Sequence, residues 1–301
     1  MRLQGYLFAA LAAATYGTNP LFAKPLYAAG MNPDSVLLFR YVIAIVMMML
    51  LIGWKSWRRK VNLRDTLTVK RHSLPQLIIM GLLMSASSIL LFVSYNYMPV
   101  GIASTLLFVY PILVAVIMAL CFGERLSWIV LGCLLTATAG VALLCRTDSS
   151  DTAAQQSFWI GFLCVMASSL AYAIYLVGLN KTRVRTIATL PVTFYVLLFG
   201  SLIYVVRLGC GIVPLVMPHG TMMWLCCLGL GLFPTVISLV MTSRAIQCIG
   251  STQTALLGAL EPVTAVTLGI AFLGESICLR EAIGMVLIFA AVTLVVGKAK
   301  G

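Results

Sequence analysis

The sequence predicts an all-α integral membrane protein with ten transmembrane helices, arranged as two inverted five-helix repeats. Three observations predict this fold class: the composition, a series of long apolar runs, and an internal repeat. Of the 301 residues, 61% are hydrophobic and only 9% are charged. A soluble domain is nearer one quarter charged. A chain with this balance cannot cover itself with polar side chains, so lipid is the expected solvent.

The apolar runs follow one another along the whole chain, and each has about the 20 residues that a bilayer span requires. The first run continues past Ala12, Ala13 and Ala14, which imitate a signal-peptide cleavage site, so we expect an uncleaved first helix. The longest loop is expected at 55–73, which leaves no room for a soluble domain. The predicted spans are 5–29, 34–54, 74–95, 100–122, 127–145, 157–179, 189–207, 221–242, 251–273 and 279–297.

The positive charges predict the orientation of these spans. The net charge is +12, but the cations form short clusters between apolar runs, which is a topology signal and argues against nucleic acid as a partner. With the N-terminus inside, fifteen of the 20 Lys and Arg residues lie on the cytoplasmic side and three lie outside. The positive-inside rule therefore places both termini in the cytoplasm, and we expect location in the bacterial inner (plasma) membrane.

The chain repeats itself. Residues 104–124 and 255–275 align at a constant offset of 151, which pairs Pro111 with Pro262 and Glu124 with Glu275. We therefore divide the chain into a first five-helix repeat at 1–150 and a second at 151–301. Five is odd, so the second half enters the bilayer upside down. Inverted halves suit alternating access, in which two equivalent bundles rock about a shared site.

The repeated motif also carries a family resemblance. An apolar helix with a central Pro closes on Gly-Glu twice, in CFGERL and in FLGES, and LLFRY surrounds Arg40. This pattern resembles the drug/metabolite transporter superfamily, in its ten-helix EamA-type branch. The resemblance covers the whole chain. It implies secondary transport of a small metabolite, often export, with substrates such as amino acids, nucleotide precursors, sugars or drugs.

We expect neither ATP hydrolysis as the energy source nor a reaction at a bound metal ion. The sequence has no G-x-x-x-x-G-K-[ST] loop, and its two histidines, His72 and His219, fall in predicted loops on opposite faces. We therefore expect no cofactor, no metal and no enzymatic activity. The expected partners are a small-molecule metabolite, the lipid bilayer and protons as a coupling ion, and we leave a homodimer open.

Glu261 is the sharpest candidate residue. It lies about ten residues into the predicted span 251–273, directly before Pro262, and so near the bilayer midplane. Charge at that depth costs at least about 2.5 kcal/mol on insertion scales. One interpretation is a carboxyl that exchanges a proton and couples transport to a proton gradient. The other is a neutral carboxyl that bonds to backbone released by Pro262. Its repeat equivalent is Tyr110, so the acid is not shared by the two halves.

Lys24 and Asn19 lie on the first predicted helix, beside Pro20 and Pro25. Two prolines so close should break the helix, and broken helices at membrane depth mark binding sites in transporters. Lys24 would then hold an anionic group, and Asn19 would offer an amide to the same cavity. The alternative for Lys24 is a cation that reaches to the outer headgroups.

Arg40 lies within the second predicted helix, where a cation needs a partner or a water-filled vestibule. Asp34, near the outer rim, is the partner we expect. A structural latch is favoured over a substrate contact. Glu124 and Glu275 fall at opposite membrane faces just before the next helix, where a carboxylate stabilises a helix N-terminus, so we assign both a structural role.

Tyrosines complete the candidate site. Tyr16 and Tyr172 align between the halves at an offset of 156, so we expect them to face one another across the pseudo-two-fold axis. Their hydroxyl groups could contact substrate, or the rings could serve only helix packing. The predicted cavity residues are Tyr16, Asn19, Lys24, Tyr110, Tyr172, Tyr175 and Glu261.

These observations favour a secondary active transporter, and an exporter in particular, of a small metabolite such as an amino acid. A membrane-embedded enzyme or a flippase for a lipid-linked substrate is the alternative. An enzyme of this kind would need a catalytic constellation near one interface, and the eight acids and two histidines of the sequence supply none that converges.

Overall fold

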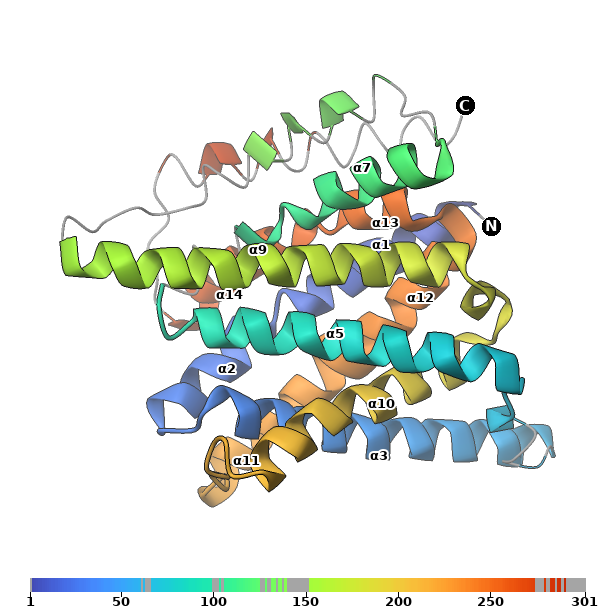
Figure 1. Ribbon diagram of the computed structural model, residues 1–301, viewed down its shortest axis with the longest axis horizontal. Coiled ribbons are helices and arrows are strands. Elements are labelled where there is room, and N and C mark those ends of the chain that lie inside the picture. The colour runs from blue at the N-terminus through green and yellow to red at the C-terminus, as the bar shows by residue number, and fades with distance from the viewer. Residues whose placement is uncertain are drawn as a thin grey trace.

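The computed structural model describes residues 2–60, 62, 66–98, 103, 106–124 and 152–273, with short pieces between 128 and 139 and between 279 and 290. Every regular element in this part of the chain is a helix, and the long helices run roughly side by side (Figure 1). The predicted helices 127–145 and 279–297 fall largely outside the described residues, as does Glu275.

The first predicted span is two helices, α1 (Arg2–Tyr16) and α2 (Asn19–Ala28). The break at Gly17 and Thr18 confirms that the first span is interrupted beside Pro20, whereas Pro25 lies inside α2 without a further break. The break falls just before Pro20, which sits in the first turn of α2, where a missing N–H costs nothing because that donor has no helical partner. The Thr18 hydroxyl donates to the carbonyl of Thr15 at 2.7 Å and helps to end α1.

Helix α3 (Pro33–Arg59) starts at an Asn32 cap, whose side-chain oxygen accepts from the Ser35 N–H at 2.8 Å. It continues past the predicted end at residue 54, so part of the loop expected at 55–73 is helical. The reason is that Trp, Lys and Arg are compatible with a helix and can extend their polar ends into the interface. A one-turn helix, η1 (Arg71–Ser73), leads into α5 (Leu74–Ser94).

The second half begins with α9 (Thr152–Lys181), which starts five residues before the predicted span. The short η2 (Arg183–Thr186) connects it to α10 (Thr189–Gly209). Helices α11 (Gly220–Gly231) and α12 (Ser238–Ile249) form one path through a π-helical turn, η3 (Leu232–Ile237), which holds Pro234. A π turn inside a long helix commonly marks a functional position.

Two further interruptions are related by the repeat. Phe108 and Val109 form a turn before α7 (Tyr110–Phe122), and Gly258 and Ala259 form a turn between α13 (Ser251–Leu257) and α14 (Leu260–Leu273). Each turn precedes one of the repeated prolines, Pro111 and Pro262.

Five of the described helical segments are long and apolar enough to cross a membrane: Pro33–Arg58, Arg71–Ser94, Phe158–Lys181, Thr189–Gly209 and Gly220–Ile249. The first, fourth and ninth predicted spans are interrupted or partly undescribed, so they do not reach that length as single helices.

The helices of the two halves are intermixed, so that the largest helix contacts join one half to the other. The most extensive helix contacts join α5 to α9 and α1 to α12, and these two pairs are repeat equivalents of each other. Small residues allow close approach, because a Cβ on Gly200 of α10 would lie 2.9 Å from the Gly81 carbonyl of α5. The fold class is thus confirmed, while the division at residue 150 stays a prediction.

Candidate functional site

The centre of the site is a hydrogen bond between the two halves. The Tyr110 hydroxyl, at the start of α7, donates to Oε1 of Glu261, at the start of α14, at 3.3 Å. These residues are 151 positions apart, which is the repeat offset, so the bond joins equivalent positions and lies at the pseudo-two-fold axis. Gly258 makes this geometry possible, because a Cβ at that position would overlap the Tyr110 hydroxyl.

The rings of Tyr16, Tyr172 and Tyr175 form a stack beside this bond. The Tyr16 and Tyr172 rings stack with centroids 6.4 Å apart and an interplanar angle of 16°. Tyr172 meets Tyr110 edge to face at 4.8 Å and stacks on Tyr175 at 6.0 Å. The structure therefore places Tyr16 and Tyr172 face to face, as expected for repeat equivalents at the axis. Edge-to-face and offset stacking are the preferred aromatic geometries.

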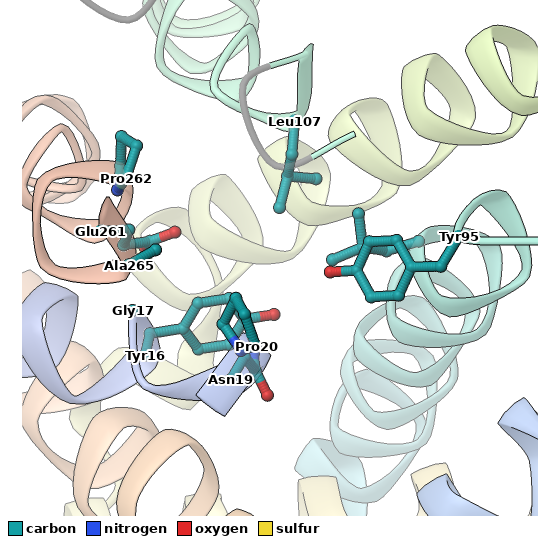
Figure 2. A pocket seen from close by; sticks show the side chains of 10 residues that line it. Tyr16, Gly17, Asn19, Pro20, Tyr95, Leu107, Glu261, Pro262 and Ala265 are labelled. Atoms are coloured by element: carbon teal, nitrogen blue, oxygen red, sulfur yellow. The ribbon is translucent and has the colours of Figure 1, made fainter. Parts of the chain in front are cut away.

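Glu261 borders two small cavities, one of which is also lined by Tyr16 and the other by Tyr110 and Tyr172. The cavity nearer α2 has a volume of about 30 Å³, and in Figure 2 Glu261 and Tyr95 lie on opposite sides of it, with Tyr16 and Asn19 below. It is lined by Tyr16, Gly17, Asn19, Pro20, Leu91, Tyr95, Leu107, Glu261, Pro262 and Ala265.

The second cavity lies nearer the N-terminal end of α1 and has a volume of about 10 Å³. It is lined by Ala9, Ala12, Ala13, Tyr110, Tyr172, Leu176, Thr242, Thr254, Ala255, Gly258 and Glu261. To hold one water molecule, a cavity needs roughly 10–15 Å³ of space that the centre of a water molecule can occupy. Both cavities are therefore of water size, and the site is closed to a metabolite in this conformation.

Arg40 is fully buried, at 0% exposure, and does not pair with Asp34 as expected. Asp34 instead binds Arg207 at the end of α10, with Arg207 Nε 2.5 Å from Oδ1. The reason is geometric: Asp34 is in the first turn of α3, at the rim, whereas Arg40 is nearly two turns deeper. The predicted partner was wrong, while the structural latch agrees with the contacts that Arg40 makes.

Those contacts join two irregular backbone segments. Arg40 Nη1 donates to the Asn19 side-chain oxygen at 3.1 Å, at the start of α2. Nε donates to the Thr235 hydroxyl at 2.5 Å, and Nη2 donates to the Pro234 carbonyl at 3.2 Å, both in η3. The guanidinium also lies 5.9 Å from the Tyr16 ring centroid. No sequence pattern singled out Thr235, although Pro234 inside an apolar run was a signal for an irregular turn there.

Asn19 and Lys24 differ in their placement. Asn19 is 4% exposed and lines the larger cavity, and its Nδ2 has no acceptor among the described residues. The Asn19 amide group can therefore donate a hydrogen bond to a molecule bound in that cavity. Lys24 is exposed and is not among the residues that line either cavity. Its proposed contact with an anionic group stays a prediction.

A polar latch at the start of α13, which the sequence did not predict, closes the face that holds the N-terminus. Three consecutive residues in the first turn of α13 each bond to a different segment. Ser251 accepts from Asn180 of α9 at 3.1 Å, Thr252 donates to Glu124 at 3.4 Å, and Gln253 accepts from Tyr6 of α1 at 2.7 Å. Glu124 thus has a structural contact, whereas the helix that it was expected to cap begins outside the described residues.

The sequence matches a known family over almost its full length. The profile of the EamA-like transporter family matches residues 3–146 and again residues 159–297. An uncharacterized transporter of Synechocystis sp. is 27% identical over 270 residues, which cover 86% of this chain and 78% of the relative. An uncharacterized transporter of Archaeoglobus fulgidus is 28% identical over 196 residues, covering 65% of this chain and 66% of the relative.

A solved crystal structure is similar in fold, with a TM-score of 0.81 and 19% sequence identity, and the match covers 100% of both chains. At this identity the likeness shows the fold alone. The double match of the family profile agrees with the internal repeat, and the apolar helices agree with a membrane protein. The chain belongs to the EamA-like transporter family and is an integral membrane transporter.

Proposed function

We propose that this transporter is a secondary active exporter of a small metabolite, such as an amino acid, driven by proton exchange at Glu261. The observation that carries the proposal is that one carboxyl lines both water-sized cavities, one beside the start of α2 and one beside the middle of α1. A proton can then reach the same group from either membrane face, provided that the two sides open in turn.

Alternating access follows from rocking of one half against the other. The Tyr110–Glu261 bond at the axis belongs to both halves, so it can persist while helices on either side move apart. Opening toward the N-terminal face would separate α13 from α1 and α9 and so break the hydrogen bonds that Gln253 makes to Tyr6 and that Ser251 makes to Asn180. We propose that this face is cytoplasmic, because the Lys and Arg residues of the sequence concentrate there.

The site favours a small substrate with both polar and apolar parts. Tyrosine rings would contact the apolar part, the spare Asn19 donor would bind an oxygen, and the Glu261 carboxyl would accept from an amine or a hydroxyl. Substrate and proton would share Glu261, so the proton would leave when the substrate binds. Exchange of one for the other converts a proton gradient into export.

The test is driven transport in proteoliposomes, with a panel of amino acids and an imposed pH gradient. Glu261→Gln keeps the shape of the side chain but cannot ionise, so we expect it to lose gradient-driven accumulation while it retains downhill exchange. Glu124→Gln is the matched control: its amide oxygen can still accept from Thr252, so the latch bond is kept, and it should accumulate substrate close to the wild-type level. Wild-type accumulation by Glu261→Gln would contradict the coupling role. If no amino acid is carried although another metabolite is, the substrate class alone is wrong.

A further inference from the structure

The end of α3 carries a pocket that the transport mechanism does not use. It has a volume of about 600 Å³ and is lined by Ser56, Trp57, Arg58, Lys60 and Asn62. We propose that this pocket binds the headgroup of an anionic phospholipid, whose acyl chain lies along the exposed face of α3. The inference does not depend on the substrate or on proton coupling.

The last turn of α3 and the residue that caps it form most of the pocket wall. Lys60 has φ 52°, which makes it the one non-glycine residue with positive φ in the described part of the chain. Its N–H donates to the Trp57 carbonyl at 3.1 Å, which ends α3. The Ser56 and Thr66 hydroxyl groups are 2.9 Å apart, which places Thr66 against the last turns of α3. A left-handed residue is a common way for a helix to end, and here it sets the direction in which the chain leaves α3 beside the pocket.

The charge of this region is complementary to phosphate. Arg58 and Lys60 are exposed cations in the pocket wall, and Lys70 and Arg71 follow before α5. Within residues 55–73 the sequence holds seven Lys and Arg residues against one acid, Asp65. Clusters of cations just beside a transmembrane helix attract anionic lipid headgroups.

An apolar stripe runs from the pocket along the lipid-facing side of α3, and it distinguishes a phospholipid from free phosphate. Val46, Leu50, Trp54 and Trp57 follow one another at spacings of four, four and three residues, so they share one helix face. Trp54 is 64% exposed and Trp57 is 82% exposed. From Val46 to Trp57 the rise is about 16 Å, close to half the thickness of the hydrocarbon core. An acyl chain in one leaflet can lie along this stripe.

The test compares lipid binding to purified full-length protein in detergent, by native mass spectrometry. The probes are phosphatidylglycerol and phosphatidylcholine with identical acyl chains. We expect the wild type to prefer phosphatidylglycerol, and Arg58→Gln with Lys60→Gln to weaken its binding by roughly ten- to thirtyfold. The control pair, Arg183→Gln with Arg185→Gln, removes two exposed cations from a different loop on the same face and should change binding by less than about twofold.

Three results would each overturn the proposal. Equal binding of the two lipids would mean that the pocket does not read the headgroup charge. Equal weakening by the control pair would show diffuse attraction rather than a site. Release of phosphatidylglycerol by millimolar inorganic phosphate would mean that the acyl stripe contributes nothing. A further variant, Trp54→Ala with Trp57→Ala, should weaken both lipids while preserving the preference between them.

Discussion

Arg40 carries its charge in the interior of the helix bundle, and its neighbours explain why the bundle tolerates it. A cation at membrane depth costs about 2.5–3.5 kcal/mol on insertion scales. Each hydrogen bond to a charged group contributes about 1.5–3 kcal/mol. Arg40 makes three such bonds and approaches two aromatic rings, so its contacts can offset the cost without a carboxylate.

We therefore expect Arg40→Lys to destabilise the protein by about 2–4 kcal/mol, because one ammonium cannot span Asn19, Pro234 and Thr235 at once. The measurement is thermal unfolding of the detergent-purified variant, in which size-exclusion chromatography after each heating step gives the fraction of protein that remains folded. Arg207→Lys is the control, since Arg207 is 35% exposed and its pair with Asp34 is expected to contribute at most about 1 kcal/mol. Equal losses in the two variants would argue against a latch at Arg40.

Among the helices, the interrupted ones determine where the molecule can change shape. The break between α1 and α2, the π turn η3 and the turn between α13 and α14 all adjoin the site. Gly250, with φ 83°, separates α12 from α13 and frees the first turn of α13 to point three side chains at three segments. A latch of separate hydrogen bonds opens more readily than a packed apolar seam, because water replaces each bond in turn.

Removing one bond of the latch should favour the conformation that is open toward the N-terminal face. Gln253→Leu leaves the Tyr6 hydroxyl without its acceptor, and a bond worth about 1 kcal/mol shifts a two-state equilibrium roughly fivefold. The readout is the labelling rate of a cysteine introduced at Ala9, which lines the smaller cavity, with a water-soluble maleimide in a background free of native cysteines.

Gln247→Leu is the matched control for this experiment. Gln247 lies on the same face, but its amide donates to the carbonyls of Arg185 and Ile187 and does not join α13 to other helices. We expect it to leave the labelling rate at Ala9→Cys unchanged. Faster labelling in both variants would mean that any loss of polar contact loosens this face, and would remove the special role of α13.

At the scale of the whole molecule, the two halves are related by more than sequence. The equivalent pairs α5–α9 and α1–α12 have corresponding contacts, and the Tyr110–Glu261 and Tyr16–Tyr172 pairs join equivalent residues. Figure 1 shows the N-terminus and the C-terminal ends of α3 and α9 on one side of the bundle. That arrangement is what an odd number of spans in each half requires.

The topology makes a direct prediction. A cysteine at Asn62, in the loop after α3, should be reached by a membrane-impermeant maleimide only from the cytoplasm. A cysteine in the connection 146–156, between the halves, should be reached only from outside. The assay is labelling of intact cells against inverted vesicles. Labelling of both positions from one side would break the inverted-repeat arrangement.

Several features follow from the sequence by itself because they depend on local pattern. Composition determines that lipid is the solvent, and the length of each apolar run determines a span. The repeated Pro and Gly-Glu positions set the offset that relates Tyr110 to Glu261. The prolines beside Asn19 predict the break in the first helix, because proline removes a backbone donor wherever it stands.

Only the tertiary structure decided which distant residues meet. Arg40 was expected to pair with Asp34, six residues away, yet its partners in η3 are more than 190 residues distant. The latch at α13 joins residues up to 247 positions apart. A helix rotates and slides to fill space against its neighbours, so the direction of each polar side chain is set by packing across the whole bundle, and no local pattern in the sequence records that outcome.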